Sequence, residues 1–409
     1  MDPRDLAEGF DLAAPPPGFA EDPYPVYRAL LAHAPLKRFP DGSVMVSRWG
    51  DLDRAYRDAA TYSSAKFVEF APKYGVAAPL YRHHTTSLVF SDPPLHTRVR
   101  RILSGALTPR AIAAMEPGLI ALADRLLDDL EREVVPNGRG SDVDLIERFA
   151  SRIPVEVIGN LFDIPLAERE PLRNWSLAIL GALEPVLTPE QEARGNAAVT
   201  DFAAYLTDLA ARRRARPGDP ASDVLTRLIQ SADPLTGEEL AQNCIFILNA
   251  GHETTTNLIG NALGALADHP AAQAALIADP SLAGRAVDEV LRYESPNQLG
   301  NRRLTVDAEV AGEMLPAGTR IHLAIGAANR DPRQFEAPDR FDITRSPNRH
   351  LAFAGGPHAC LGLTLARMEG RVALIRFLAR FPNWRVSGPR RRTGRLRFRG
   401  YASLSARLG

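Results

Sequence analysis

Helical periodicity runs almost without interruption from Leu95 to Glu294, and this limits the chain to a mainly α-helical fold. Helices are predicted over residues 95–106, 111–133, 145–161, 166–182, 190–214, 221–230, 237–268, 270–278, 281–294 and, further on, 363–380. Capping signals mark several starts, at Thr108-Pro109, Thr188-Pro189-Glu190 and Thr236-Gly237-Glu238-Glu239. Strand-like alternation is confined to residues 36–46, 302–326 and 384–408. The sequence therefore predicts a mainly α fold with a minor β region, and a solvated arginine-rich stretch at 390–399.

The chain before Leu95 is less regular. Residues 1–20, which include Pro15-Pro16-Pro17, are predicted to be an irregular lead-in to a single domain over 21–409. Short helices are predicted over 25–32 and 51–59. Residues 61–90 show no steady period and are predicted to be a long irregular segment, which in a compact protein is more often functional than idle.

Composition bounds the class of protein. The chain has 409 residues, of which 45% are hydrophobic and 24% charged, enough to form a sizeable core. Lys plus Arg and Asp plus Glu both number 49, so no basic excess points to nucleic acid. Two cysteines are too few for a disulfide framework. With no signal-peptide form and no apolar run long enough for a bilayer, we expect a cytoplasmic protein without a membrane partner.

A glycine-rich loop, Phe353–Gly362, brings Cys360 to the start of the helix predicted over 363–380. Free backbone N–H groups and the helix dipole at this position stabilise a thiolate. Gly356 and Gly362 permit backbone conformations and close approaches that a Cβ would block. A lone cysteine in a glycine-rich turn is usually a buried small hydrophobe. If Cys360 is functional, the loop alone does not distinguish a metal ligand from a nucleophile with His358 as its base.

The predicted central helix contains an unusual interior, Ala-Gly-His-Glu-Thr-Thr-Thr at residues 250–256. Threonine hydroxyls can bond carbonyls one turn back and glycine relaxes the helix, so a local bulge is expected near Gly251. In isolation this pattern favours a flexible kink whose threonine hydroxyls are satisfied by hydrogen bonds within the cluster. A pair of opposite charges, Glu289 and Arg292, shares one face of a later helix, but such pairs are common on surfaces.

Together these motifs carry a resemblance. Phe-x-x-Gly-x-x-x-Cys-x-Gly, read at Phe353, Gly356, Cys360 and Gly362, resembles the haem-thiolate signature of the cytochrome P450 family. The resemblance implies a single P450-type domain in which Cys360 is the axial ligand of haem b (iron protoporphyrin IX), with O2 as co-substrate. Residue 354, often glycine in the family, is alanine here.

The resemblance also assigns the motif at 250–256 to oxygen activation. It implies that the Thr254 hydroxyl lies near bound dioxygen, that Glu253 passes protons inward, and that Gly251, after Ala250, leaves room for the oxygen. It further implies a buried structural triad of Glu289, Arg292 and Arg340. The haem propionates would be held by His96, Arg100, Arg302 and His358.

The function implied is a monooxygenase that inserts one atom of O2 into a small, largely apolar organic substrate by hydroxylation or oxidative dealkylation. A peroxide-driven or non-oxygenating haem-thiolate enzyme is the alternative. Because the chain has no recognisable flavin or iron–sulfur domain, electrons would come from a ferredoxin and its reductase. The candidate pocket residues are Phe67, Leu88, Leu248, Asn297, Leu299 and Tyr401.

Overall fold

The computed structural model describes residues 2–134 and 142–408. The chain folds as two compact units. The first unit comprises Met1–Ser63, Gly118–Ile153 and Thr254–Gly409, and the second comprises Ser64–Pro117 and Pro154–Glu253. In the described ranges, no helix combines the length and apolar character needed to cross a bilayer.

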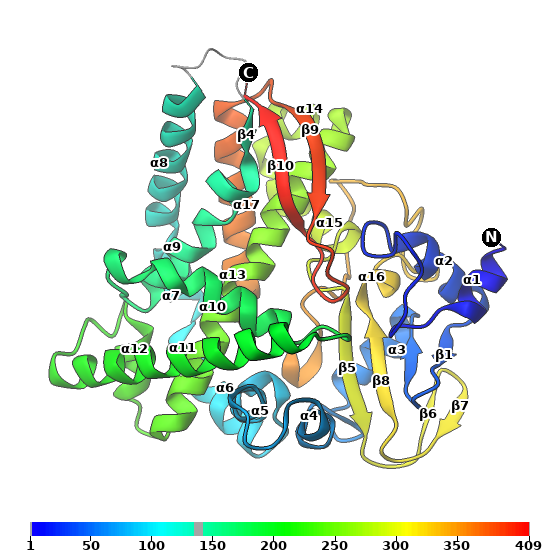
Figure 1. Ribbon diagram of the computed structural model, residues 1–409. Coiled ribbons are helices and arrows are strands. Elements are labelled where there is room, and N and C mark those ends of the chain that lie inside the picture. The colour runs from blue at the N-terminus through cyan, green and yellow to red at the C-terminus, as the bar shows by residue number, and fades with distance from the viewer. Residues whose placement is uncertain (1, 135–141, 409) are drawn as a thin grey trace. The chain divides into compact units, whose positions relative to one another are not determined.

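The first unit contains all the β structure of the described residues (Figure 1). Its larger sheet has the order β1-β2-β8-β5-β3, with strands β1 (Leu36–Arg38), β2 (Val44–Val46), β8 (Arg320–Ala324), β5 (Leu299–Leu304) and β3 (Tyr62–Ser63). Only the β2–β8 pair is parallel. A smaller sheet has the order β4 (Val143–Asp144), β10 (Tyr401–Arg407) and β9 (Arg385–Arg392). These positions confirm the predicted hairpin at 36–46 and the strands predicted at 302–326 and 384–408.

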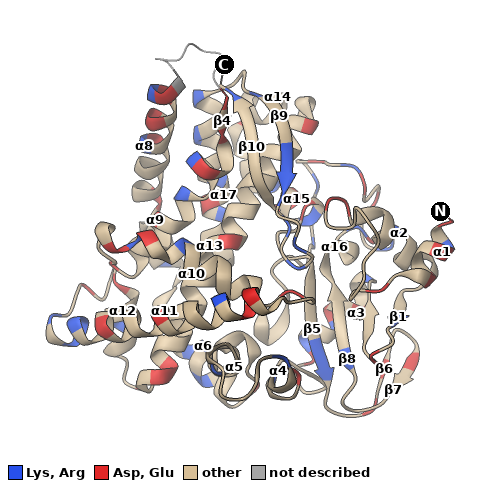
Figure 2. Ribbon diagram, viewed as in Figure 1, with Lys and Arg blue, Asp and Glu red and all other residues tan. Residues whose placement is uncertain are grey.

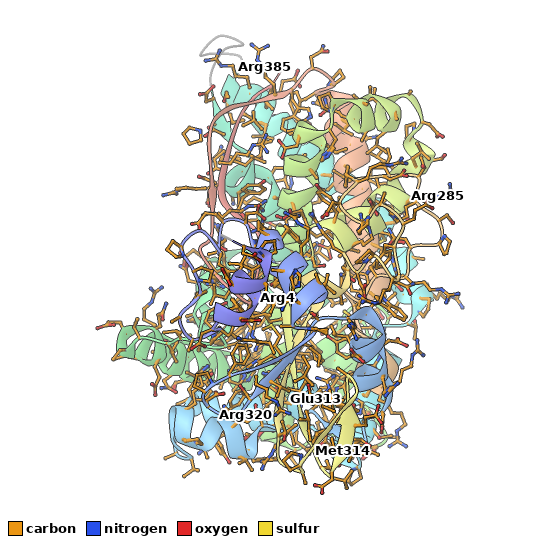
Figure 3. The ribbon with its side chains drawn as sticks, turned by 90° about the vertical axis from the view of Figure 1, so that its right-hand side faces the viewer. Arg4, Arg285, Glu313, Met314, Arg320 and Arg385 are labelled. Carbon is orange, nitrogen blue, oxygen red and sulfur yellow. The ribbon has the colours of Figure 1, made fainter. Side chains whose placement is uncertain are left out.

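Strands β6 (Ala308–Val310) and β7 (Glu313–Leu315) form a separate hairpin. In Figure 3, Glu313 and Met314 mark this hairpin, where Met314 is exposed. Figure 2 shows that β9 carries a run of basic residues.

Residues 2–20 are not irregular, although the sequence predicted an irregular lead-in over residues 1–20. Helix α1 (Pro3–Gly9) is capped by Asp2, whose side chain accepts a hydrogen bond from the Arg4 backbone N–H, and Pro3 fits the first helical position. The following aromatic residues, Phe10 and Phe19, are buried in one cluster with helix α2 (Tyr24–His33). The segment is therefore part of the core.

The other helices of the first unit lie close to the predicted ranges, except α16 (Ile325–Ala328), which the sequence did not predict and which begins inside the stretch 302–326 predicted to be strand-like. They are α3 (Trp49–Arg57), α14 (Pro270–Ala278), α15 (Ala283–Tyr293), α16 and α17 (Leu363–Arg380), with short 3₁₀ turns at Pro280–Leu282 and Gly356–His358. Helix α8 (Glu116–Val134) begins at the end of the first segment of the second unit, Ser64–Pro117. A π turn at Ile146–Ala150 leads into α9 (Arg152–Leu161).

The described part of the second unit is helical. It contains α4 (Phe67–Tyr74), α5 (Pro79–Thr86), α6 (Leu95–Ala106), α7 (Pro109–Ala114), α10 (Glu170–Gly181), α11 (Pro189–Ala215) and α12 (Val224–Ile229), with 3₁₀ turns at Leu88–Phe90 and Leu166–Glu168. The prediction of an irregular segment over 61–90 is therefore wrong, because α4 and α5 occupy most of it. Helix α13 (Gly237–Asp268) has the predicted bounds and runs from the second unit into the first.

Prolines divide several segments that the sequence predicted as single helices. Pro117, Pro154 and Pro171 stand in the first turns of α8, α9 and α10. Proline is tolerated there but cannot continue a helix from the preceding residues, so a new helix begins at each of them. The stretches 111–133, 145–161 and 166–182 are split accordingly.

Candidate functional site

The cysteine loop, residues 351–362, is a tight turn in the first unit. The Cys360 backbone N–H donates to the Phe353 carbonyl at 2.9 Å, and the Ala354 N–H donates to the Leu351 carbonyl at 2.9 Å. Gly356 has φ +60°, and a Cβ there would clash with the carbonyl oxygen of Tyr56 in α3. Glycine is therefore required at 356, as the sequence predicted.

Gly362 behaves differently. It is the N-cap of α17, has φ −89°, and a Cβ there would meet no described atom within 4 Å. Neither the backbone conformation nor packing among the described residues requires glycine at 362, so the role expected for Gly362 stays a prediction about the bound ligand. Ala354 has φ +54°, in the left-handed region that favours glycine. The alanine noted in the sequence thus occupies a position whose backbone suits glycine better.

The two cysteines lie in contrasting surroundings, and they are not joined by a disulfide. Cys244, in α13, is 1% exposed, and burial raises the pKa of its thiol. Cys360 is only partly buried and precedes the N-terminus of α17. A haem iron needs a single thiolate from the protein. A thiol that is outside the core and next to free backbone N–H groups fits that role, whereas the inert setting of Cys244 does not.

A buried ion-pair network lies in the segments before the cysteine loop. Glu289 and Arg292, on α15, are both fully buried and form two hydrogen bonds of 2.8 Å, Nε to Oε2 and Nη2 to Oε1. Arg292 also donates through Nη1 to the carbonyls of Asn329, at 3.0 Å, and Pro338, at 2.8 Å. A guanidinium with so many acceptors is well satisfied despite its burial.

Arg340 does not complete this network with its side chain, contrary to the prediction. Its guanidinium is exposed and pairs with Asp342 at 2.6 Å, and only its carbonyl accepts from Arg292. Arg345 takes the place instead, with Nε 3.2 Å from Glu289 Oε2. The backbone between residues 340 and 345 turns so that the second arginine points inward.

The network reaches the cysteine loop through one amide side chain. Asn329 Oδ1 accepts from the Leu351 backbone N–H at 2.7 Å, and Asn329 Nδ2 donates to Ser295 Oγ at 2.7 Å. The Asn329 carbonyl is in turn held by Arg292. The first residue of the loop is therefore fixed by hydrogen bonds that lead back to Glu289.

The other candidate haem contacts of the first unit lie on β5 and in the loop. Arg302, on β5, stacks over the Tyr56 ring at 5.3 Å, and Arg303 donates to the Gly318 carbonyl. His358 ends the short helical turn that precedes Cys360. In the second unit, helix α6 begins at Leu95 as predicted and carries His96, which is buried, and Arg100 one turn later.

Helix α13 is continuous through the motif at 250–256, so the bulge expected near Gly251 is absent. Most of this stretch is buried, but Phe246, Ala250, Gly251 and Thr254 are partly exposed. Phe246 and Thr254 lie one turn before and one turn after the adjacent Ala250 and Gly251, which puts all four on one side of the helix. Glu253 is 3% exposed, and burial lowers the pKa of the neighbouring His252 to about 3, with Arg173 adding to the effect.

Gly251 is explained by packing. A Cβ at this position would lie 2.5 Å from Cδ1 of Ile158 in α9, much closer than side chains tolerate. The space that the resemblance reserved for oxygen is, in the direction of the missing Cβ, filled by Ile158.

The candidate substrate residues differ in exposure and in their local partners. In the second unit Phe67 is 50% exposed, whereas Leu88 and Leu248 are buried. In the first unit Leu299 belongs to the core cluster around α1 and α2, and Asn297 forms a β-bridge with Phe398. Tyr401 lies under the Arg392 guanidinium at 3.8 Å. Leu299 and Tyr401 therefore have structural partners of their own.

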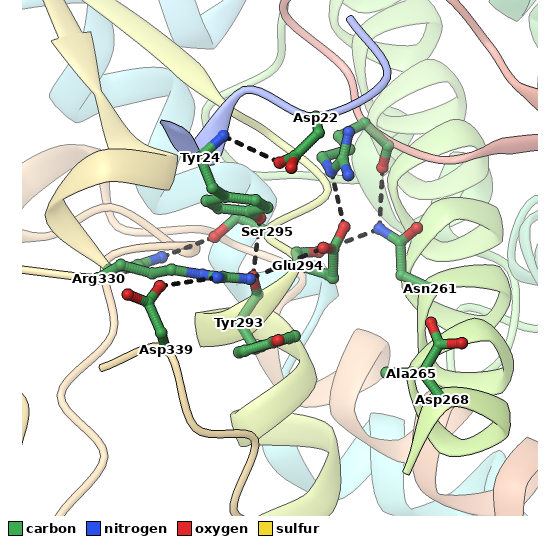
Figure 4. Close-up of polar contacts among 12 residues, drawn as sticks. Asp22, Tyr24, Asn261, Ala265, Asp268, Tyr293, Glu294, Ser295, Arg330 and Asp339 are labelled. Atoms are coloured by element: carbon green, nitrogen blue, oxygen red, sulfur yellow. Dashed lines mark hydrogen bonds and ion pairs between the residues drawn. The ribbon is translucent and has the colours of Figure 1, made fainter. Parts of the chain in front are cut away.

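Sequence reasoning missed a second buried polar cluster, around Glu294 (Figure 4). Arg330 lies between the Tyr24 and Tyr293 rings, with its guanidinium carbon 3.5 and 3.8 Å from their centroids. Arg399 Nε is 2.6 Å from Glu294 Oε2 and is 5% exposed, so the predicted solvation of the stretch 390–399 is wrong at this residue. Buried arginines of this kind give no periodic signal in the sequence.

Comparison with known proteins identifies the family to which this fold belongs. The family model described as Cytochrome P450 matches residues 53–389. The chain belongs to the cytochrome P450 family. Members of this family are monooxygenases, hence oxidoreductases, that use haem b with a cysteine thiolate ligand and O2. The mainly α P450 fold predicted from the sequence is confirmed.

Several relatives of this P450 come from bacteria. It is 35% identical to Cytochrome P450 107B1 of Saccharopolyspora erythraea over 391 residues, covering 92% of each chain. It is 36% identical to the Vitamin D(3) 25-hydroxylase of Pseudonocardia autotrophica, covering 89% of this chain and 87% of the relative. The crystal structure of P450BioI in complex with hexadec-9Z-enoic acid ligated acyl carrier protein superposes with a TM-score of 0.88 and 33% identity, covering 96% of this chain and all of that one.

Proposed function

We propose that this P450 inserts one atom of O2 into a small, largely apolar organic substrate, by hydroxylation or oxidative dealkylation, and that Cys360 is its haem ligand. When bound, haem supplies the oxygen-activating chemistry. The observation that carries the proposal is the partly exposed thiol at the start of α17, in a loop fixed to the Glu289–Arg292 pair. The network holds the loop in one conformation, so the thiolate is positioned before any ligand binds.

The chain's cationic residues would bind the haem propionates. We assign this role to Arg302 and His358 in the first unit and to His96 and Arg100 in the second. Guanidinium and imidazole groups donate charge-assisted hydrogen bonds to carboxylates. The support is local: the Tyr56 ring holds the Arg302 guanidinium, and α6 places His96 and Arg100 one turn apart.

Glu253 and Thr254 would hold and move protons along α13. Thr254 belongs to the partly exposed side of the helix, where its hydroxyl can exchange protons, and Glu253 adds a carboxyl from the buried side. Replacing Thr254 with alanine should divert reducing equivalents from product to peroxide. Thr255→Ala, at the buried neighbouring position, is the matched control. If Thr254→Ala forms as much product per reducing equivalent as the wild type, the role proposed for Thr254 is wrong.

Electrons are proposed to come from a ferredoxin and its reductase. Turnover should require both proteins and should weaken as salt rises, because docking between charged surfaces is screened. Equal turnover with hydrogen peroxide alone would instead support a peroxide-driven enzyme.

The ligand assignment is tested by comparing the two cysteines. Cys360→Ser should abolish the red-shifted Soret band that a thiolate gives to the reduced, carbon-monoxide-bound haem. Cys244→Ser should keep that band, because Cys244 is buried in α13 of the second unit. A normal band in Cys360→Ser would contradict the proposal. With the wild type, a screen of apolar compounds for a low- to high-spin shift would then identify the substrate class.

A further inference from the structure

A groove in the second unit has none of the residues proposed for haem and substrate in its lining. Its volume is about 340 Å³, and its described lining comes from α5, α11, α12 and the first turns of α13. We call it the α11 groove and define it by Ala203, Leu206, Ala210, Leu225, Leu240 and Ala241. A volume of this size is within the range of small-molecule sites.

The shape of the groove suits a chain-like molecule. Helix α11 contributes residues from Ala203 to Arg214, and at 1.5 Å per residue this stretch is about 16 Å long. Its residues 203, 206, 207, 210 and 214 share one face of the helix. Ala203, Leu206 and Ala210 make this face apolar, apart from Thr207 and the terminal Arg214, so the methylene groups of a ligand would contact these three side chains.

One buried side chain offers a hydrogen bond to a ligand. Gln242 lines the groove, is 5% exposed, and bonds through Oε1 to Nδ1 of His83 in α5 at 2.9 Å. No other hydrogen bond of the Gln242 side chain occurs among the described residues, which leaves its amide nitrogen able to donate.

The rim of the groove carries an excess of positive charge. Arg82 Nε lies 3.5 Å from Glu238 Oε1, and both side chains are exposed, so these two charges offset each other. Arg214 is in the last turn of α11, where Figure 2 shows basic residues, and no carboxylate in the described ranges lies within ion-pair distance of it. A ligand with one negative group would complement this rim.

We propose that the α11 groove binds an amphipathic monocarboxylate of medium chain length, separately from the haem site. Its hydrocarbon chain lies along Ala203, Leu206 and Ala210, and its carboxylate pairs with Arg214. The groove is thus a second ligand site of this P450, in which binding leaves the haem spectrum unchanged.

Dodecanoate is the probe, and the haem-loaded full chain is the protein. Calorimetry should show a binding event that is absent from the absorption spectrum of the haem. Affinity should rise about fourfold per methylene from octanoate to dodecanoate as more apolar surface is buried. Ala210→Trp, which fills the groove, should abolish this event, and Ala211→Trp, on the exposed side of α11, should keep it.

Arg214→Ala provides a test that needs no repacking, because this side chain is exposed. It should weaken dodecanoate binding about tenfold and leave dodecanol binding unchanged. The proposal is overturned if all the heat released on adding dodecanoate is accounted for by the binding that changes the haem spectrum. It also fails if Ala210→Trp, folded and haem-loaded, binds dodecanoate like the wild type, or if Arg214→Ala weakens dodecanoate and dodecanol equally.

Discussion

Arg345 Nε lies 3.2 Å from Glu289 Oε2, so Arg345, and not Arg340, contributes the second guanidinium at this buried carboxylate. Asn348 Nδ2 adds a hydrogen bond of 3.1 Å, and the Asp342 N–H one of 2.8 Å. Since Glu289 is fully buried, each of these donors offsets part of its desolvation.

Arg345→Ala should therefore destabilise the fold by about 1–3 kcal/mol, because it removes a charged donor from a buried acceptor. Arg340→Ala, at an exposed surface pair, should cost less than about 1 kcal/mol. Thermal unfolding of both variants, followed by circular dichroism, checks the order. Equal losses would mean that the two arginines share the role.

Gly356→Ala should disrupt the cysteine loop. The positive φ costs an alanine about 1–2 kcal/mol, and its Cβ would clash with backbone that cannot move aside easily. The matched control is Gly355→Ala, where φ is −157° and the nearest side-chain atom is 3.6 Å from the new Cβ. Haem content and melting temperature should fall for Gly356→Ala and stay near wild type for Gly355→Ala.

Ala354→Gly should stabilise the protein by about 0.5–1 kcal/mol. Its φ of +54° is strained for alanine, and glycine relieves the strain at some cost in chain entropy. The control Ala359→Gly makes the same substitution at a residue with φ −51°, where alanine is not strained. It should instead destabilise the protein slightly. Urea unfolding of the two variants should thus give shifts of opposite sign, whereas shifts of the same sign would show that no strain resides at Ala354.

Gly251→Ala should destabilise the fold, and the loss of stability should be smaller when residue 158 has a smaller side chain. In the single variant the new Cβ meets Ile158 at 2.5 Å. Adding Ile158→Ala removes the opposing atoms, so the double variant should lose less stability than the sum of the two single changes. Additive losses in a double-mutant cycle would show that Ile158 is not what requires glycine at 251.

Glu369, on α17, should make stability fall with rising pH. Burial raises the pKa of its carboxyl from 4.5 to about 8, and its Oε2 has no hydrogen-bond partner among the described residues. Between these values the folded state binds the proton that the unfolded state has released, so stability is lost as pH rises from 4.5 through 8. Glu369→Gln, neutral throughout, should match the wild type near pH 5 and exceed it near pH 8, with the difference growing by up to about 1.4 kcal/mol per pH unit. Parallel curves in urea unfolding from pH 5 to 8 would contradict this.

The helix boundaries that sequence reasoning predicted well are those fixed by local contacts. The capping box of Thr188 and Gln191 and the reciprocal bonds of Thr236 and Glu239 join residues three apart, so the signal lies within one turn. The cysteine loop was similarly predictable, because glycine and cysteine spacing in a short stretch defines it.

The predictions that failed concern helices and ion pairs that depend on contacts between residues far apart in the sequence. Helices α4 and α5 are held by long-range bonds, such as Tyr74 OH to the Ala182 carbonyl and the Leu80 N–H to Asn196 Oδ1, and their own sequences show no steady period. Likewise, Arg340 and Arg345 stand in the same stretch of sequence, and only the folded backbone selects Arg345 as the partner of Glu289.

The Arg399 guanidinium donates to the carbonyls of Ala20, at 3.2 Å, and Glu21, at 2.9 Å. These contacts join segments that are 379 residues apart along the chain. During synthesis the segment around Ala20 and Glu21 therefore waits, without this hydrogen-bond partner, until Arg399 has left the ribosome.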